Sequence, residues 1–185
     1  MDHGRPLDHK NPGEVVSLPT GERPSVVEVY SVSARQREQI LSGLNLDLMW
    51  EYAAMVQYIQ HASMLTGPEY VAIIQEELQH AQDEHEHAVI LSDLIQYLGG
   101  IPTIEVAERL TSLDNEEMLR QDLQAEYNAI KRYLTRIQQL ESAGLYDSAQ
   151  KIRNIVVVEQ NHAIELEKAL GIRRATSPGP FGSNA

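Results

Sequence analysis

The sequence of 185 residues contains no cysteine. This absence excludes disulfides, thiolate zinc sites, iron–sulfur clusters and Cys-X-X-Cys electron-transfer motifs. No apolar run approaches the roughly 20 residues that a membrane span requires, so we expect no membrane partner. Residues 1–6 contain no apolar segment of the secretory type, and we therefore expect the protein in the cytoplasm.

Basic residues are scarce as well. Only 15 Lys and Arg accompany 27 Asp and Glu, which gives a formal net charge of −12. A surface of this sign repels nucleic acid and concentrates cations, so we do not expect nucleic acid as a partner. Acidity that only keeps the protein soluble is the competing interpretation of this charge. The length is sufficient for one domain with a sizeable core.

Proline and glycine are concentrated near the two ends of the sequence. Residues 1–32 end in a short β-like run, Val26 to Tyr30, and are interpreted as an extended N-terminal arm that reaches a partner subunit. Residues 171–185 contain the run Ser177 to Pro180 and are expected to form a flexible C-terminal tail. Between these segments, residues 33–170 have an almost continuous helical pattern and are predicted to form one domain.

Capping residues and glycines divide residues 33–170 into four helices. The first begins near Ser33, where Gln36 completes a capping box, and stops before Gly67; the second covers about residues 69–98. The third opens at Asp114 and breaks at Gly144, and the fourth covers residues 145–170. The connection of residues 99–113 is too long for a tight hairpin. An all-α four-helix bundle with one long crossover is therefore predicted, in place of an up-down-up-down bundle.

Pairs of the type Glu-x-x-His place both side chains on one helix face about one turn apart. Three such pairs occur: Glu77/His80, Glu84/His87 and Glu159/His162. Bundles that hold two metal ions combine two of these pairs with a single Glu from each of the other two helices. Any single pair is more often a solvated surface pair than a metal site, so the positions of the pairs in the bundle must decide.

Residues equidistant from the loop of an antiparallel hairpin lie at the same depth. Glu51 precedes Gly67 by 16 residues and Glu84 follows it by 17, whereas Glu77 lies seven residues nearer the loop, about 10 Å off level. In the second hairpin, Glu126 and Glu159 are separated by 33 residues, as are Glu51 and Glu84. The two halves therefore repeat one plan of four carboxylates and two imidazoles, which suits iron or manganese. The predicted metal ligands are Glu51, Glu84, His87, Glu126, Glu159 and His162.

These motifs resemble those of bacterioferritin over about residues 34–170. The first helix carries Glu51, the pair Gln57-Tyr58 and the run His61-Ala-x-Met, and the other three helices match at Glu84-x-x-His-Ala, Glu126 and Glu159-x-x-His. The resemblance implies a ferritin-like fold with two iron ions per chain, manganese being the alternative. It also implies that Glu84 and Glu126 bridge the ions and that His87 and His162 are terminal ligands.

The resemblance also implies a role for Tyr58, which matches the tyrosine beside the iron pair in bacterioferritins. We expect it to be a catalytic residue that donates a further electron. A core tyrosine whose hydroxyl bonds to a ligand carboxylate is the structural interpretation of the same residue, and the two are compatible.

The sequence departs from bacterioferritin at two places. The family binds haem through a Met directly after the second-helix glutamate, but His85 stands there, so haem is not expected. The residues after Gly171 are rich in Pro and Gly and are predicted to form no fifth helix, the element that helps to close the family's 24-subunit shell. We therefore expect a homo-oligomer, preferably a homodimer, with a smaller closed shell as the alternative.

Four further residues are predicted to lie together, because Glu77 and His80 share the helix stripe of Glu84 and His87. Tyr58 and His61 are expected opposite them. A hydrogen-bond network beside the metal ions is the favoured interpretation, and an accessory iron site is the alternative.

The leading functional hypothesis is oxidation of Fe(II) at a di-iron centre with O2 or peroxide as acceptor. The second hypothesis is a di-iron or di-manganese oxidase, oxygenase or peroxide-consuming enzyme whose metals never leave. A bundle whose metals only hold helices together ranks last, because structural zinc prefers fewer carboxylates and a closed tetrahedral site.

Overall fold

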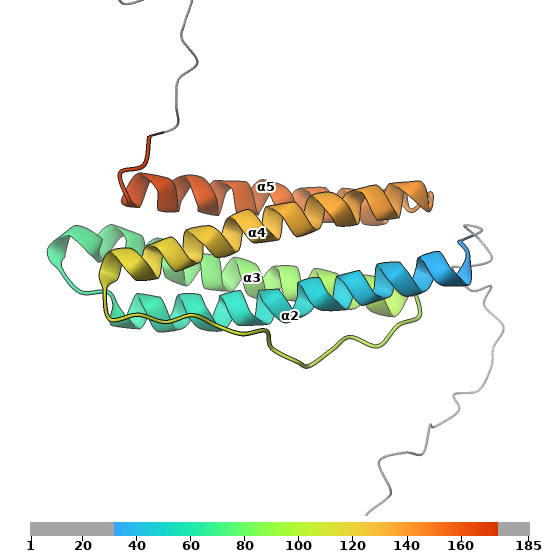
Figure 1. Ribbon diagram of the computed structural model, residues 1–185, viewed down its shortest axis with the longest axis horizontal. Coiled ribbons are helices and arrows are strands. Elements are labelled where there is room, and N and C mark those ends of the chain that lie inside the picture. Colours follow the sequence, from blue (N-terminus) through green and yellow to red (C-terminus); the bar gives the residue numbers. More distant parts are fainter. Residues whose placement is uncertain (1–31, 174–185) are drawn as a thin grey trace, which may run out of the picture.

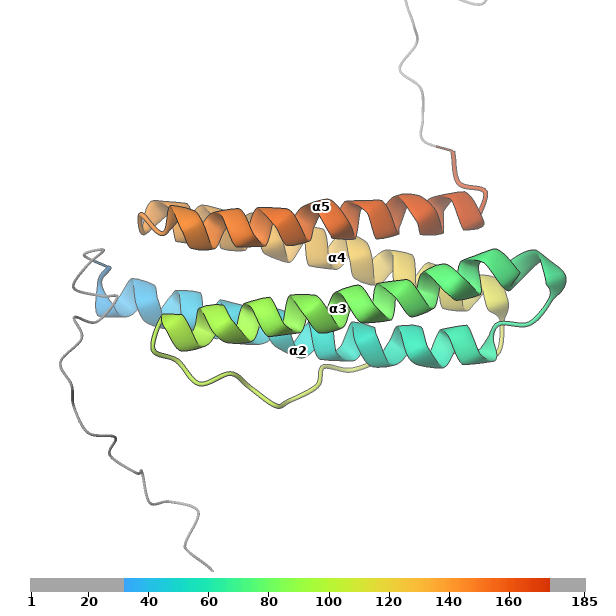
Figure 2. The same cartoon turned by 180° about the vertical axis from the view of Figure 1, so that it is seen from behind.

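The computed structural model describes residues 32–173, which form four long helices and one 3-10 turn. Figures 1 and 2 show that α2 runs beside α3, that α4 runs beside α5, and that the two pairs stack into one bundle. The predicted all-α four-helix bundle with a long crossover is confirmed. The arm before Val32 and the tail after residue 173, with its expected lack of a fifth helix, lie outside the described residues. The elements are α2 (Ala34–Met64), η1 (Pro68–Tyr70), α3 (Val71–Tyr97), α4 (Asn115–Ser142) and α5 (Tyr146–Ala169).

Local sequence signals set most helix boundaries. Ser33 caps α2 through a full capping box, in which its hydroxyl accepts from the backbone of Gln36 and the Gln36 side chain accepts from the backbone of Ser33. Asp114 caps α4 by accepting from the backbone N–H of Glu117 at 2.8 Å. The second helix starts two residues later than predicted, because the proline at the start of Pro68–Tyr70 opens a separate 3-10 turn.

The crossover between α3 and α4 lies along α2, as Figure 1 shows. The backbone N–H groups of Thr103, Ala107 and Leu110 donate in turn to Asn45, Met49 and Gln57 of α2. These bonds satisfy backbone groups of an otherwise irregular segment and fix its course along the helix. The crossover therefore joins opposite ends of the bundle and covers the side of α2 that faces away from α3.

The core has two apolar clusters with a polar layer between them. One cluster contains Leu44, Leu91 and Ile152, and the other contains Ile73, Leu119 and Leu166. The buried histidines and most of the buried glutamates occupy sequence positions between the two clusters on their helices. Within residues 32–173, none of the helices is long and apolar enough to span a bilayer.

A buried ion pair joins the two helix pairs away from this polar layer. The Arg136 Nε of α4 donates to the Asp47 Oδ2 of α2 at 2.8 Å, with 5% and 0% of the two residues exposed. A Cβ at Gly43 would lie 1.6 Å from the guanidinium of Arg136, so glycine at this position gives the arginine its path across α2.

Candidate metal centre

All six predicted ligands lie in the polar layer, and α2, α3, α4 and α5 each contribute at least one. Their exposed fractions lie between 1 and 3%, although four of the six are glutamates, a residue type that is seldom fully buried. The distances from the hairpin loops predicted that Glu51 lies level with Glu84, and Glu126 with Glu159. The structure brings both pairs together. Glu77 belongs to a separate group, which agrees with its offset from the loop.

The six side chains form two overlapping groups. Ligand atoms of Glu51, Glu84, His87 and Glu159 lie within 4.8 Å of one another, and so do those of Glu84, Glu126, Glu159 and His162. Glu84 and Glu159 belong to both groups, whereas Glu126 belongs to one. This arrangement differs from the bridges that the family resemblance implied, Glu84 and Glu126, because a bridging carboxylate must face both positions.

The first group is centred on the ring of His87. Its Nδ1 lies 3.1 Å from Glu84 Oε2, 3.3 Å from Glu51 Oε2 and 3.3 Å from Glu159 Oε1. One imidazole nitrogen therefore faces carboxylates from three different helices. This convergence gives a binding position with one nitrogen and several oxygen donors.

The second group repeats the pattern around His162. Its Nδ1 lies 3.4 Å from Glu84 Oε1, 3.5 Å from Glu159 Oε2 and 3.7 Å from Glu126 Oε1. Its other ring nitrogen, Nε2, lies 3.1 Å from Asp83 Oδ2. A histidine that ligates a metal commonly donates its second N–H to a carboxylate in this way, which fixes the ring orientation. Asp83 was not predicted, because nothing in the sequence distinguishes it from other charged neighbours of Glu84.

Several buried polar atoms of the two groups lack a hydrogen-bond partner among residues 32–173. Both oxygens of Glu159 are in this state, as are one oxygen each of Glu51, Glu84 and Glu126 and the Nδ1 of His162. Buried carboxylate oxygens without donors cost free energy unless a positive charge compensates them. The unpartnered atoms and the donor types therefore fit a pair of cations with a preference for oxygen and nitrogen.

The charges of the two groups are strongly coupled. Burial raises the pKa of Glu51, and the neighbouring charges of Glu84 and Glu159 add to the effect. Burial alone would lower the pKa of both histidines, but the facing carboxylates, first of all Glu159 at His87 and Glu126 at His162, raise it well above its usual value. Protons on the imidazoles thus balance part of the carboxylate charge in the metal-free protein.

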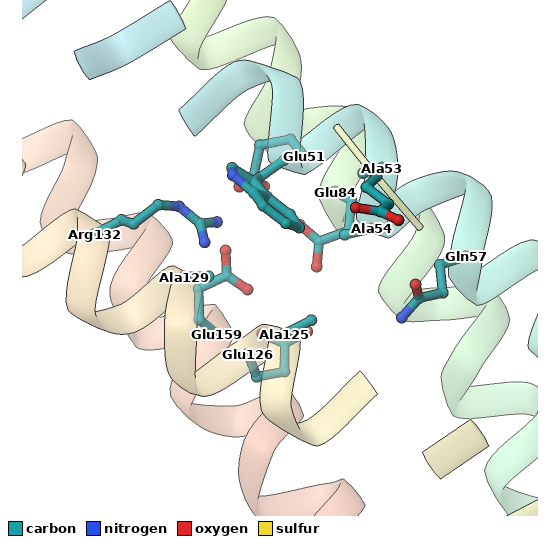
Figure 3. A pocket seen from close by; sticks show the side chains of 12 residues that line it. Glu51, Ala53, Ala54, Gln57, Glu84, Ala125, Glu126, Ala129, Arg132 and Glu159 are labelled. Atoms are coloured by element: carbon teal, nitrogen blue, oxygen red, sulfur yellow. The ribbon is translucent and has the colours of Figure 1, made fainter. Parts of the chain in front are cut away.

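A small cavity of about 30 Å³ lies among the four glutamates. Figure 3 shows Glu51 and Glu84 projecting toward it from α2 and α3, opposite Glu126 and Glu159 from α4 and α5. A cavity of this size has room for at least one water molecule. Arg132 of α4 and Glu108 of the crossover also line the cavity, so it carries one basic side chain besides the acidic ones.

Tyr58 lies beside this centre and is 1% exposed. Its hydroxyl donates a short hydrogen bond to Glu126 Oε1. Burial raises the pKa of Tyr58 well above its usual value, and the negative charges of Glu126 and Asp122 add to the effect. The phenol therefore keeps its proton and contacts a predicted ligand directly.

The four further residues predicted to lie together, Tyr58, His61, Glu77 and His80, divide into two parts. His80 stacks on His162 with ring centroids 3.9 Å apart, lies edge-on to Tyr58 at 5.1 Å and contacts Glu165 through Nε2 at 2.8 Å. His61 and Glu77 instead form a buried group with Asp122 of α4. Sequence reasoning missed Asp122, although its position four residues before Glu126 places it on the same face of one helix.

Comparisons with known proteins agree with this geometry. Residues 41–175 match the model of the ferritin family, which describes a ferritin-like domain. A bacterioferritin of Brucella melitensis biotype 1 is 27% identical over 135 residues, covering 72% of this chain and 84% of that protein. A bacterioferritin of Streptomyces coelicolor is 26% identical over 140 residues, covering 72% and 81%. A crystal structure of ferritin-like, diiron-carboxylate proteins from Bacillus anthracis strain Ames superposes with a TM-score of 0.72 at 30% identity, covering 75% of this chain and 99% of that one.

Proposed function

The chain belongs to the ferritin family, and from this premise we propose that it binds two iron ions and oxidises Fe(II) with O2 or peroxide as acceptor. One observation carries the proposal: six buried carboxylate and imidazole side chains from four helices converge in two overlapping groups. A pair of Fe(II) ions held there would supply the two electrons that reduce O2, with two protons, to H2O2, or H2O2, with two protons, to two water molecules. The Bacillus anthracis neighbour is described as a diiron-carboxylate protein, which supports iron as the metal.

The two groups suggest a role for each ligand. Glu51 and His87 would hold one ion, Glu126 and His162 would hold the other, and Glu84 and Glu159, which belong to both groups, would serve both positions. A carboxylate shared by two cations keeps them close and balances both charges. Carboxylate ligands also favour the ferric over the ferrous state, because they stabilise the higher charge.

The chain's own side chains tune this centre. Asp83 holds the ring of His162 so that Nδ1 faces the glutamates. Tyr58 keeps Glu126 in place through its hydrogen bond and is positioned to donate a further electron. Arg132 and Glu108 line the cavity that reaches the glutamates, and we propose that Fe(II) and the oxidant enter there.

The partner subunits are proposed to associate through α2 and α3. Eight of the large hydrophobic side chains exposed on the described helices lie on α2 and α3, against three on α4 and α5. Exposed apolar side chains of this number favour burial in a subunit contact. A homodimer is the favoured assembly, and a closed shell is the alternative.

Stoichiometry of oxidation tests this function. The protein is titrated anaerobically with Fe(II), exposed to O2 and followed by absorbance of ferric iron and by oxygen consumption. We expect two Fe(II) per chain to react rapidly and further additions to be oxidised again. Oxidation that stops at two ions per chain would show that the metals stay bound. It would favour the second hypothesis, a di-iron oxidase or oxygenase. Binding of Mn(II) without any oxidation of Fe(II) would contradict the proposal.

A further inference from the structure

A second buried group of metal-binding residue types lies beside the six ligands. It consists of His61 of α2, Glu77 of α3 and Asp122 of α4, whose ligand atoms lie within 4.8 Å of one another. Their exposed fractions are 0%, 0% and 1%, so this group is as buried as the di-metal centre. None of the three residues belongs to either group of the di-metal centre.

Hydrogen bonds hold two of the three residues in fixed positions. His61 Nδ1 lies 2.6 Å from Asp122 Oδ2, and the side-chain amide of Gln57 donates to Asp122 Oδ1 at 2.9 Å. The Gln57 side chain is itself fixed, because its oxygen accepts from the backbone of Leu110 in the crossover. The Nδ1 of His61 therefore faces a carboxylate from another helix, as the Nδ1 of His87 and the Nδ1 of His162 do in the di-metal centre.

The remaining polar atoms of the group are unsatisfied. In the described part of the chain, the two oxygens of Glu77 have no hydrogen-bond partner. The Nε2 of His61 has none either. Buried polar atoms are nearly always paired, and two adjacent buried carboxylates with no compensating charge are costly. The vacant hydrogen-bonding positions therefore indicate an occupant with positive charge.

A proton on Glu77 is the competing occupant. Burial raises the pKa of Glu77 to about 10, and the charge of Asp122 adds to the effect. The metal-free protein thus holds a proton on Glu77 at neutral pH. A proton cancels the charge of one carboxylate only, whereas a divalent cation would displace it, cancel both charges and bind His61 through Nδ1, the nitrogen that faces Asp122.

We propose that His61, Glu77 and Asp122 form a third metal site, which binds one divalent first-row transition ion such as Fe(II) or Mn(II). Two carboxylates and one imidazole are donors suited to these ions. Tyr58 lies between this site and the di-metal centre: its hydroxyl bonds to Glu126, and the charges of Asp122 and Glu77 both act on it. The site does not depend on the proposed oxidation, since it requires only equilibrium binding.

The neighbouring group Glu76, His80 and Glu165 is a weaker candidate. Its members are exposed, buried and partly exposed, respectively, and His80 Nε2 already contacts Glu165. The charge of an exposed carboxylate is solvated without any cation. It therefore serves as an internal comparison for the buried site.

Metal counting on the full-length protein tests the proposal. Metal-free protein is dialysed to equilibrium against Co(II), which takes similar ligands without being oxidised, and bound cobalt is measured by mass spectrometry. Glu77→Gln keeps the shape of the side chain and removes its charge. We expect this variant to bind one ion fewer per chain than the wild type. The difference holds whether or not the protein oxidises Fe(II), so failure of the oxidation and failure of this site are distinguishable.

Two control variants make the count specific. Glu86→Gln removes an exposed charge from the same helix, and Glu165→Gln disrupts the comparison group. Both should bind as many ions as the wild type and keep its visible cobalt spectrum. A count that is equal in Glu77→Gln and wild type would overturn the proposal, as would loss of an ion in Glu165→Gln. If circular dichroism shows that Glu77→Gln does not fold, the count for the wild type decides. A wild type that binds no more than two ions per chain would contradict a third site.

Discussion

The hydroxyl of Tyr58 on α2 bonds to Glu126 on α4, so a residue that is not a predicted ligand positions one that is. Tyr58→Phe removes this bond without opening a large cavity. We expect the variant to bind iron but to oxidise it about ten-fold more slowly, since one hydrogen bond to a charged group contributes about 1.5 kcal/mol. Stopped-flow absorbance measures the rate.

Tyr52→Phe is the matched control, because Tyr52 lies on the same helix and packs against the apolar core. It should oxidise Fe(II) at the wild-type rate. Electron paramagnetic resonance during oxidation should show a tyrosyl radical in wild type and in Tyr52→Phe, and none in Tyr58→Phe. Equal rates in all three proteins, with the radical retained in Tyr58→Phe, would remove Tyr58 from the mechanism.

Metal binding should release protons. The pKa values of His87 and His162 are raised in the metal-free protein, since the neighbouring glutamate carboxylates outweigh the opposing effect of burial. Both imidazoles are therefore protonated at neutral pH and must lose their protons to bind metal. Apparent affinity should fall as pH falls, about ten-fold per pH unit for each proton displaced.

A pH indicator in weakly buffered solution measures this release during anaerobic titration with Fe(II). We expect at least one proton per ion over the first two ions. His85→Gln, at an exposed position next to Glu84, should leave the release unchanged. An apparent affinity for Fe(II) that does not change between about pH 6 and pH 8 would contradict the loss of protons from these imidazoles on metal binding.

The ion pair of Asp47 and Arg136 should contribute to stability independently of any metal. Asp47→Asn leaves the buried guanidinium of Arg136 without its charged partner. Breaking a buried pair in this way destabilises proteins by about 3 to 5 kcal/mol. Urea unfolding of the metal-free protein measures the loss. Glu38→Gln, at an exposed position on α2, should change the free energy of unfolding by less than about 0.5 kcal/mol.

Assembly separates storage from resident catalysis. Light scattering of the native protein should give a mass near that of two chains. Ile59→Asp places a charge on the exposed apolar surface of α2 and should shift the protein toward single chains, whereas Val157→Asp on α5 should not. A mass of twelve or more chains would favour a closed shell and bulk iron storage.

The helices and the convergence of the six candidate ligands could be predicted because signals within each helix and each hairpin specify them. Ser33 and Asp114 cap their helices through side chains within three residues, and the repeated separation of 33 residues follows from antiparallel pairing. Two contacts between helices could not be predicted. The contact of Asp83 with His162 and the sharing of Glu159 by both groups depend on helix rotation and rotamers, which have no signature in a single sequence.

The central claim is that Glu51, Glu84, His87, Glu126, Glu159 and His162 hold two iron ions as a coupled pair. Mössbauer spectroscopy tests it most directly, on protein loaded anaerobically with two equivalents of iron-57 per chain and then exposed to O2. A coupled pair gives a diferric product with no net spin, and we expect a quadrupole doublet that stays free of magnetic splitting at low temperature. Spectra of isolated high-spin ferric ions, magnetically split at low temperature, would contradict a di-iron centre.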